Sequence, residues 1–140
     1  MTRSRSMPAD AEAVFDVVSD LDNLTTWLPG SVEVELSGPN LIKLWLPRRT
    51  GDLEVERRID IDWDRLRIRW GSETNSSCSG SLRVLRLAPG RSAVSVTLSG
   101  PPGTARSTVS AWIEESLEAL ELVIATERRN GGMVHQVARC

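Results

Sequence analysis

The spacing of apolar side chains near the start of the chain is helical. Val14, Val17 and Val18 recur three to four residues apart, and Pro8 and Asp10 before them suit the start of a helix. After the polar break at Ser19 and Asp20, a second helical set follows: Leu21, Leu24, Trp27 and Leu28. Pro29 and Gly30 then stop it. The pattern predicts two short helices followed by a turn.

From residue 31 to residue 100 the apolar period changes to two, which is typical of strands. Alternating or apolar runs cover residues 32–36, 41–47, 53–63, 66–70, 80–89 and 92–100. The connections between them are short, so we expect an antiparallel sheet. In the run 80–89 the alternation changes after Val84, which we interpret as a bulge.

The last apolar pattern predicts one long amphipathic helix from Ala105 to Arg128, about 36 Å in length. Its apolar positions are Val109, Trp112, Ile113, Leu117, Leu120, Val123 and Ile124, and Glu114, Glu118 and Glu121 lie opposite. Asn130 and Gly131 predict its end. We therefore expect a single domain over residues 1–128 and a tail, 129–140, that forms a loose extension or a packing arm.

Composition narrows the class of protein. A chain of 140 residues is the size of one domain. Its formal charge is −2, with basic and acidic residues interleaved, which argues against binding nucleic acid. Cys78 and Cys140 have neither disulfide nor metal-site spacing, and the first residues lack the apolar run of a signal peptide or membrane span. We expect a cytoplasmic protein with no metal and no cofactor.

Two stretches carry a family resemblance. "MPADAEAVFDVVSDLDNLTTWLPG" (7–30) and "SLEALELVIATE" (116–127) resemble the N-terminal signature and closing helix of the START-like (SRPBCC) superfamily. This superfamily includes polyketide cyclase and dehydrase-like proteins, plant pollen-allergen-like carriers and lipid-transfer domains. The resemblance implies the α+β helix-grip fold, in which a curved antiparallel sheet wraps around a long C-terminal helix. It also implies a first strand near residues 3–7, at a sheet edge or beside the last strand.

In such a fold the helix side chains leave part of the space under the curved sheet unfilled, and an apolar cavity binds apolar ligands. We expect Trp27 and Leu28 at its mouth. The other expected ligand-binding residues are Val55, Arg57, Ile59, Ile61, Trp70, Val94, Val96, Trp112 and Ile113. Ordinary core packing is the alternative interpretation of each of them.

Arg57 is the most informative member of this set, because strict alternation places it among Val55, Ile59 and Ile61 on the apolar face. A buried guanidinium needs a partner, and a carboxylate or enolate oxygen of a ligand is one. The alternatives are a bulge that turns Arg57 outward or a salt bridge to an internal acid. Lys43 lies between Leu41 and Trp45, and the pattern leaves open which face of the sheet its side chain points to.

Catalytic motifs are scarce. His135 falls in the tail, tyrosine is absent, and neither a Gly-x-Ser-x-Gly elbow nor a phosphate-binding loop occurs. Asp60 and Asp62 share a polar strand face, which suits solvated charges. Arg57 is therefore the one catalytic candidate.

Two functional classes follow, and we favour the first. The first is a protein that binds a small hydrophobic, lipid- or polyketide-like ligand. The second is a polyketide cyclase, aromatase or dehydratase that acts on a poly-β-ketone in the same cavity. Interaction with another protein through a sheet edge or the tail is a third hypothesis, with a homodimer as the alternative partner.

Overall fold

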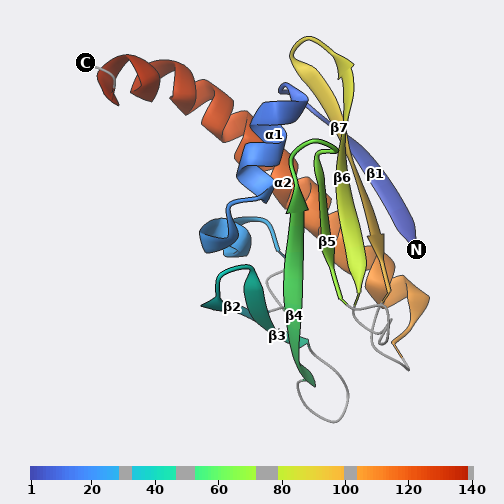
Figure 1. Ribbon diagram of the computed structural model, residues 1–140. Helices are drawn as coiled ribbons and strands as arrows, with labels where there is room; N and C mark the ends of the chain where they lie inside the picture. The colour runs from blue at the N-terminus through green and yellow to red at the C-terminus, as the bar shows by residue number, and fades with distance from the viewer. Residues whose placement is uncertain (29–32, 47–52, 72–78, 100–103, 139–140) are drawn as a thin grey trace.

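The computed structural model describes residues 1–28, 33–46, 53–71, 79–99 and 104–138, apart from the side chains of Leu46, Leu53 and residues 127–138. A strand, an α-helix and a 3-10 helix come first, then six strands and a long helix (Figure 1). The elements are β1 (Thr2–Met7), α1 (Ala11–Val18), η1 (Leu21–Thr26), β2 (Glu33–Gly38), β3 (Leu41–Leu46), β4 (Leu53–Asp62), β5 (Arg67–Trp70), β6 (Gly80–Ala88), β7 (Arg91–Leu98) and α2 (Arg106–Ala138).

The strands form one curved antiparallel sheet in the order β1-β7-β6-β5-β4-β3-β2. β1 pairs with β7 from Thr2 opposite Thr97 to Met7 opposite Ser92, so the predicted first strand does lie beside the last strand. Every other pair joins strands that are consecutive in the chain, as the short connections predicted. The α+β class and the antiparallel sheet are confirmed.

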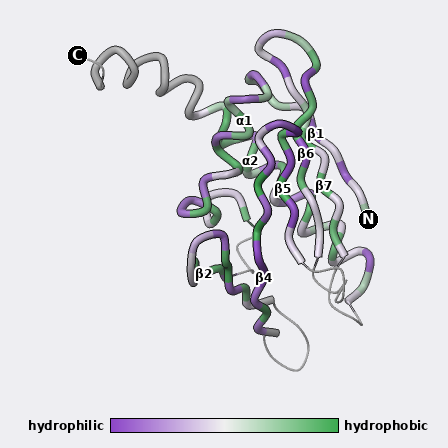
Figure 2. Tube along the Cα trace, in the orientation of Figure 1, coloured by the Kyte–Doolittle hydropathy of each residue, from purple (hydrophilic) through white to green (hydrophobic). Residues whose placement is uncertain are grey.

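The two faces of the sheet differ in character. The inner face, which looks toward α2, carries Val94 and Val96 of β7, Leu82 of β6 and Ile68 of β5, all buried. Alternate positions carry polar side chains on the outer face, and the tube in Figure 2 changes colour along β4 and β5 accordingly. The period-two pattern of the sequence is therefore the pattern of these two faces.

α2 crosses the inner face behind β7 and β1 (Figure 1). Of its seven predicted apolar positions, Val123 is half-buried. The other six are buried: Val109, Trp112, Ile113, Leu117, Leu120 and Ile124. Two ion pairs join the helix to β1. Arg5 Nε lies 2.7 Å from Glu121 Oε2, and Arg3 Nε lies 3.9 Å from Glu114 Oε1.

α1 packs against β6 and β7. Val14, Phe15 and Val18 are completely buried beneath it, and Phe15 meets the Trp63 ring edge to face, with 4.6 Å between ring centroids. Glu12 of α1 forms an ion pair with Arg86 of β6. The backbone N–H of Gly90 donates to Asp10 Oδ1 over 2.6 Å. Apolar burial and two polar links thus fix α1 on the sheet.

Four local predictions need correction. The second helix is a 3-10 helix, and it is kinked at Asn23, whose φ of −113° and ψ of 20° are not helical. Leu66 is not a strand residue: it lies in the turn before β5 with φ 50°, yet its side chain is buried.

The other two corrections concern a bulge and a helix end. The bulge expected after Val84 is present in β6, but it lies further along, between Arg86 and Ala88; Arg86 still follows the alternation and pairs with Glu12. α2 does not end at Asn130 and Gly131 but runs to Ala138. A glycine in a helix costs only about 1 kcal/mol relative to alanine, which is too little to end a helix by itself.

Some predictions lie outside the described residues. These are the turn at Pro29 and Gly30, the loops 47–52 and 72–78, the stretch 100–103 and the side chains of the tail, including His135. Among the described helices, none has the length and apolar content to span a membrane.

Candidate functional site

Arg57 lies on the inner face of β4. It pairs with Ile42 of β3, which is buried, and the register between β3 and β4 runs without a shift from Leu41 to Leu46. The bulge that would have turned Arg57 outward is therefore absent from this pairing. The side chain is half-buried, and its Nη1 donates to the backbone oxygen of Glu56 over 2.8 Å. A guanidinium thus shares a face with Ile42 and Ile59.

Lys43 has the opposite orientation. It occupies the outer face of β3, and its Nζ lies 3.4 Å from Glu54 Oε1 on β4. Glu35 of β2 and Glu56 of β4 are its cross-strand partners. Lys43 therefore lies among acidic side chains on the outer face. Of the two cations considered, Arg57 is the one that faces inward.

Trp27 lies at the end of η1, which contacts both β2 and α2. Its side chain is buried, with 7% of its surface exposed, and its indole Nε1 has no hydrogen-bond partner among the described residues. A buried donor without an acceptor costs about 1 to 3 kcal/mol. A ligand that brings an acceptor to Nε1 would remove this penalty.

The remaining predicted residues divide by burial. Ile59, Val94, Val96, Trp112 and Ile113 belong to the buried core cluster. Leu28, Val55, Ile61 and Trp70 are half-buried. In the strand register Trp70 of β5 lies opposite Ile59 of β4, and it packs against the core. Contact of any of these residues with a ligand stays a prediction.

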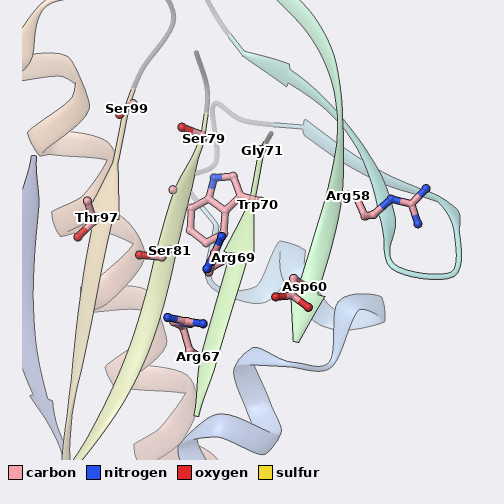
Figure 3. A pocket seen from close by; sticks show the side chains of 11 residues that line it. Arg58, Asp60, Arg67, Arg69, Trp70, Gly71, Ser79, Ser81, Thr97 and Ser99 are labelled. Atoms are coloured by element: carbon pink, nitrogen blue, oxygen red, sulfur yellow. The ribbon is translucent and has the colours of Figure 1, made fainter. Parts of the chain in front are cut away.

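A second site was not predicted. A pocket of about 530 Å³ opens on the outer face of the sheet (Figure 3). Of the expected ligand-binding residues, Trp70 is the one that lines it. The lining residues are Arg58, Asp60, Arg67, Arg69, Trp70, Gly71, Ser79, Gly80, Ser81, Thr97 and Ser99. Trp70 lies close to Gly80, where an added Cβ would come within 2.7 Å of the indole Cζ2.

Cross-strand register assembles the polar part of this pocket. One row runs from Thr97 of β7 through Ser81 of β6 and Arg69 of β5 to Asp60 of β4. The next row contains Arg67 and Asp62. Hydrogen bonds from the side chain and backbone N–H of Arg65 lower the pKa of Asp62 below its ordinary value.

The sequence does contain a signal for this pocket, in the alternation of Arg67 and Arg69 on β5 and of hydroxyl residues on β7. That alternation says only that each set shares a face. The strand register, which brings Ser81 and Thr97 level with Arg69, joins them into one site, and register was not predicted.

Comparison with solved structures identifies the fold. The Zhui aromatase/cyclase from Streptomyces sp. R1128 superposes with a TM-score of 0.68 at 19% identity, over 94% of this chain and 96% of that one. A START superfamily protein from Mycobacterium smegmatis gives 0.64 at 14% identity, over 90% and 97%. The di-domain aromatase/cyclase StfQ of the steffimycin pathway gives 0.68 at 20% identity, over 92% of this chain and 46% of that one. At these identities the likeness shows a shared helix-grip fold.

No curated protein matches the sequence. A family profile does, over residues 1–125, and its description is polyketide cyclase / dehydrase and lipid transport. The matched range includes both stretches that carried the resemblance, apart from the last two residues of the second. With the fold and the profile in agreement, this chain belongs to the polyketide cyclase / dehydrase and lipid transport family.

Proposed function

We propose that this protein binds a small hydrophobic molecule, lipid-like or polyketide-like, between α2 and the inner face of the sheet. The observation that carries the proposal is the buried indole N–H of Trp27, which finds no acceptor among the described residues. Proteins rarely bury a donor without a partner. A ligand carbonyl or ester oxygen would supply the missing acceptor.

Arg57 of β4 supports the same proposal. Its half-buried guanidinium shares a face with Ile42 and Ile59, so a ligand there would meet apolar walls and one cation. Ligand sites commonly combine an apolar lining with a few polar groups that fix orientation. An apolar molecule with one or two oxygen atoms fits that chemistry.

The first prediction tests binding with Nile red, an uncharged probe that the arginines of the outer pocket do not attract by charge. We expect saturable fluorescence enhancement, which long-chain fatty acids reverse by competition. Trp27→Phe keeps the ring and removes the N–H, so Nile red should bind about 2- to 10-fold more weakly, as expected for the loss of one neutral hydrogen bond.

Trp63→Phe is the matched control, since Trp63 is half exposed and packs against Phe15 of α1. It should leave the Nile red affinity unchanged. If the wild-type protein shows no saturable binding of Nile red or fatty acids, the proposed function is wrong. If both variants weaken binding equally, Trp27 is not the anchor.

A cyclase is the second candidate function, and the inward position of Arg57 favours it. In an aldol closure, a C–C bond forms between an enol carbon and a carbonyl carbon, and the carbonyl oxygen gains negative charge before it takes up a proton. A guanidinium next to that oxygen stabilises the charge. In the dehydration that would follow, the neighbouring α-carbon loses a proton, a C=C bond forms, and the C–O bond breaks so that the hydroxyl group leaves as water.

The second prediction concerns this reaction. With a synthetic poly-β-ketone thioester, Arg57→Met should reduce the cyclised product at least about 100-fold, the loss typical of an oxyanion donor. Arg83→Met, which removes an exposed cation from the outer face of β6, should retain wild-type turnover. Chromatography of cyclised and spontaneous products measures both. Undiminished turnover in Arg57→Met would exclude the catalytic role, and ligand binding without turnover in the wild type would leave the carrier function.

A further inference from the structure

The outer-face pocket collects positive charge in a chain whose formal net charge is −2. Its lining contains three arginines, Arg58, Arg67 and Arg69. It contains one aspartate, Asp60. Arg67 also lies directly opposite Arg83 of β6 in the strand register. Neighbouring like charges on one face of a sheet repel and destabilise it. An additional anion among the guanidinium groups would therefore reduce this repulsion.

The carboxylates nearby neutralise these cations only in part. Arg69 lies opposite Asp60, yet no ion pair joins the two side chains in the described structure. Arg67 Nη2 is 4.0 Å from Asp62 Oδ2, while Arg65 Nη1 is only 3.0 Å from the same oxygen. Arg67 Nε is buried and has no hydrogen-bond partner among the residues described. Donors for an anion thus remain on both Arg67 and Arg69.

Hydroxyl groups continue the pocket beyond the arginines. Ser81 of β6 and Thr97 of β7 stand in the same cross-strand row as Arg69, and Ser99 follows at the end of β7 (Figure 3). These side chains both donate and accept hydrogen bonds. A volume of about 530 Å³ is in the range of pockets that bind small molecules, and it exceeds what a single inorganic ion fills.

We propose that this pocket binds a small organic phosphate. Its phosphoryl oxygens would lie on the guanidinium groups of Arg67 and Arg69, and its neutral polar part on Ser81 and Thr97. A phosphate monoester carries close to two negative charges at neutral pH and three acceptor oxygens, which suits two adjacent guanidinium groups better than a carboxylate with one charge. The site is separate from the inner face and does not depend on the function proposed there.

The third prediction tests this site by calorimetric titration at constant ionic strength with ribose 5-phosphate, inorganic phosphate and ribose. Ribose 5-phosphate should bind saturably and more tightly than inorganic phosphate, because it also reaches the hydroxyl groups, and ribose should not bind. Arg69→Gln should weaken ribose 5-phosphate binding about tenfold or more, as expected for a lost charge-assisted hydrogen bond.

Arg91→Gln is the matched control, because it removes the same charge from an exposed position at the far end of β7, outside the pocket. Its affinity for ribose 5-phosphate should stay within about twofold of wild type, because a distant exposed charge is screened by salt. Equal weakening by both variants, or no saturable heat with any phosphate, would overturn the proposal. Nile red binding and thermal unfolding of Arg69→Gln verify that the variant is folded.

Ser81→Ala addresses the hydroxyl part. It should weaken ribose 5-phosphate and leave inorganic phosphate unchanged, and an unchanged affinity for both would overturn that part of the assignment. Sedimentation with vesicles of phosphatidylcholine and phosphatidic acid distinguishes a lipid phosphate from a soluble one. Vesicle binding that ribose 5-phosphate displaces agrees with the proposal, whereas vesicle binding without any binding of the soluble phosphate contradicts it.

Discussion

Ser92 is the residue at which the inner face of β7 departs from its apolar pattern. It precedes Val94 and Val96 on that face and pairs with Met7 of β1. The side chain is completely buried, and its Oγ has no hydrogen-bond partner among the described residues. A hydroxyl in such surroundings loses its bonds to water and gains none in return. Its presence therefore opposes folding.

The fourth prediction follows from this environment. Ser92→Ala should raise the free energy of unfolding by about 1 kcal/mol, because it removes an unsatisfied polar atom and leaves only a small void. Urea denaturation followed by circular dichroism measures the change. Ser95→Ala is the control, since Ser95 lies on the outer face of the same strand and should change little. A loss of stability in Ser92→Ala would mean that the hydroxyl has a partner in solution.

At the scale of elements, periodicity was sufficient to predict β2 to β7, both N-terminal helices and the buried stripe of α2, because each depends on one repeat along the chain. β1 was expected only from the family resemblance. The details that failed depend on contacts between elements. Arg86 continues the alternation of β6 because Glu12 of α1 is within reach, and Leu66 is buried although it sits in a turn.

The candidate sites show the same division. Alternation alone placed Arg57 on the inner face, and the structure has it there. Lys43 lies in a strand with apolar residues at both alternate sets of positions, so only the pairing with Glu54 settles its direction. The outer pocket needs three strands in register before its arginines and hydroxyl groups meet, and a pattern within one strand contains no such information.

For the whole molecule, ion pairs at the edge of the apolar core join each α-helix to a strand of the sheet. Arg5 of β1 holds Glu121 of α2, and Arg86 of β6 holds Glu12 of α1. The hydrogen bond and the negative charge of Glu121 raise the pKa of Arg5, whose guanidinium group is charged throughout the physiological range in any case. Glu12 and Asp62 are the carboxylates of the described chain whose pKa values shift, and they make acid stability testable.

The fifth prediction concerns acid stability. The backbone N–H of Glu12 and the Arg86 side chain lower the pKa of the Glu12 carboxyl below its ordinary value of 4.5, and Arg65 does the same for Asp62, whose ordinary value is 3.8. The unfolded chain therefore binds protons more readily than the folded one. The stabilisation is complete above these ordinary values and is lost as the pH falls through the lower, folded pKa values.

Thermal unfolding measured from pH 7 to about pH 3 should therefore show a Tm that falls across this window. The double variant Glu12→Gln, Asp62→Asn should have a lower Tm at pH 7 and a shallower fall of Tm with pH. Glu33→Gln, an exposed residue without an ion pair in the described chain, should leave both unchanged, and an acid limb as steep in the double variant as in the wild type would show that other groups control it.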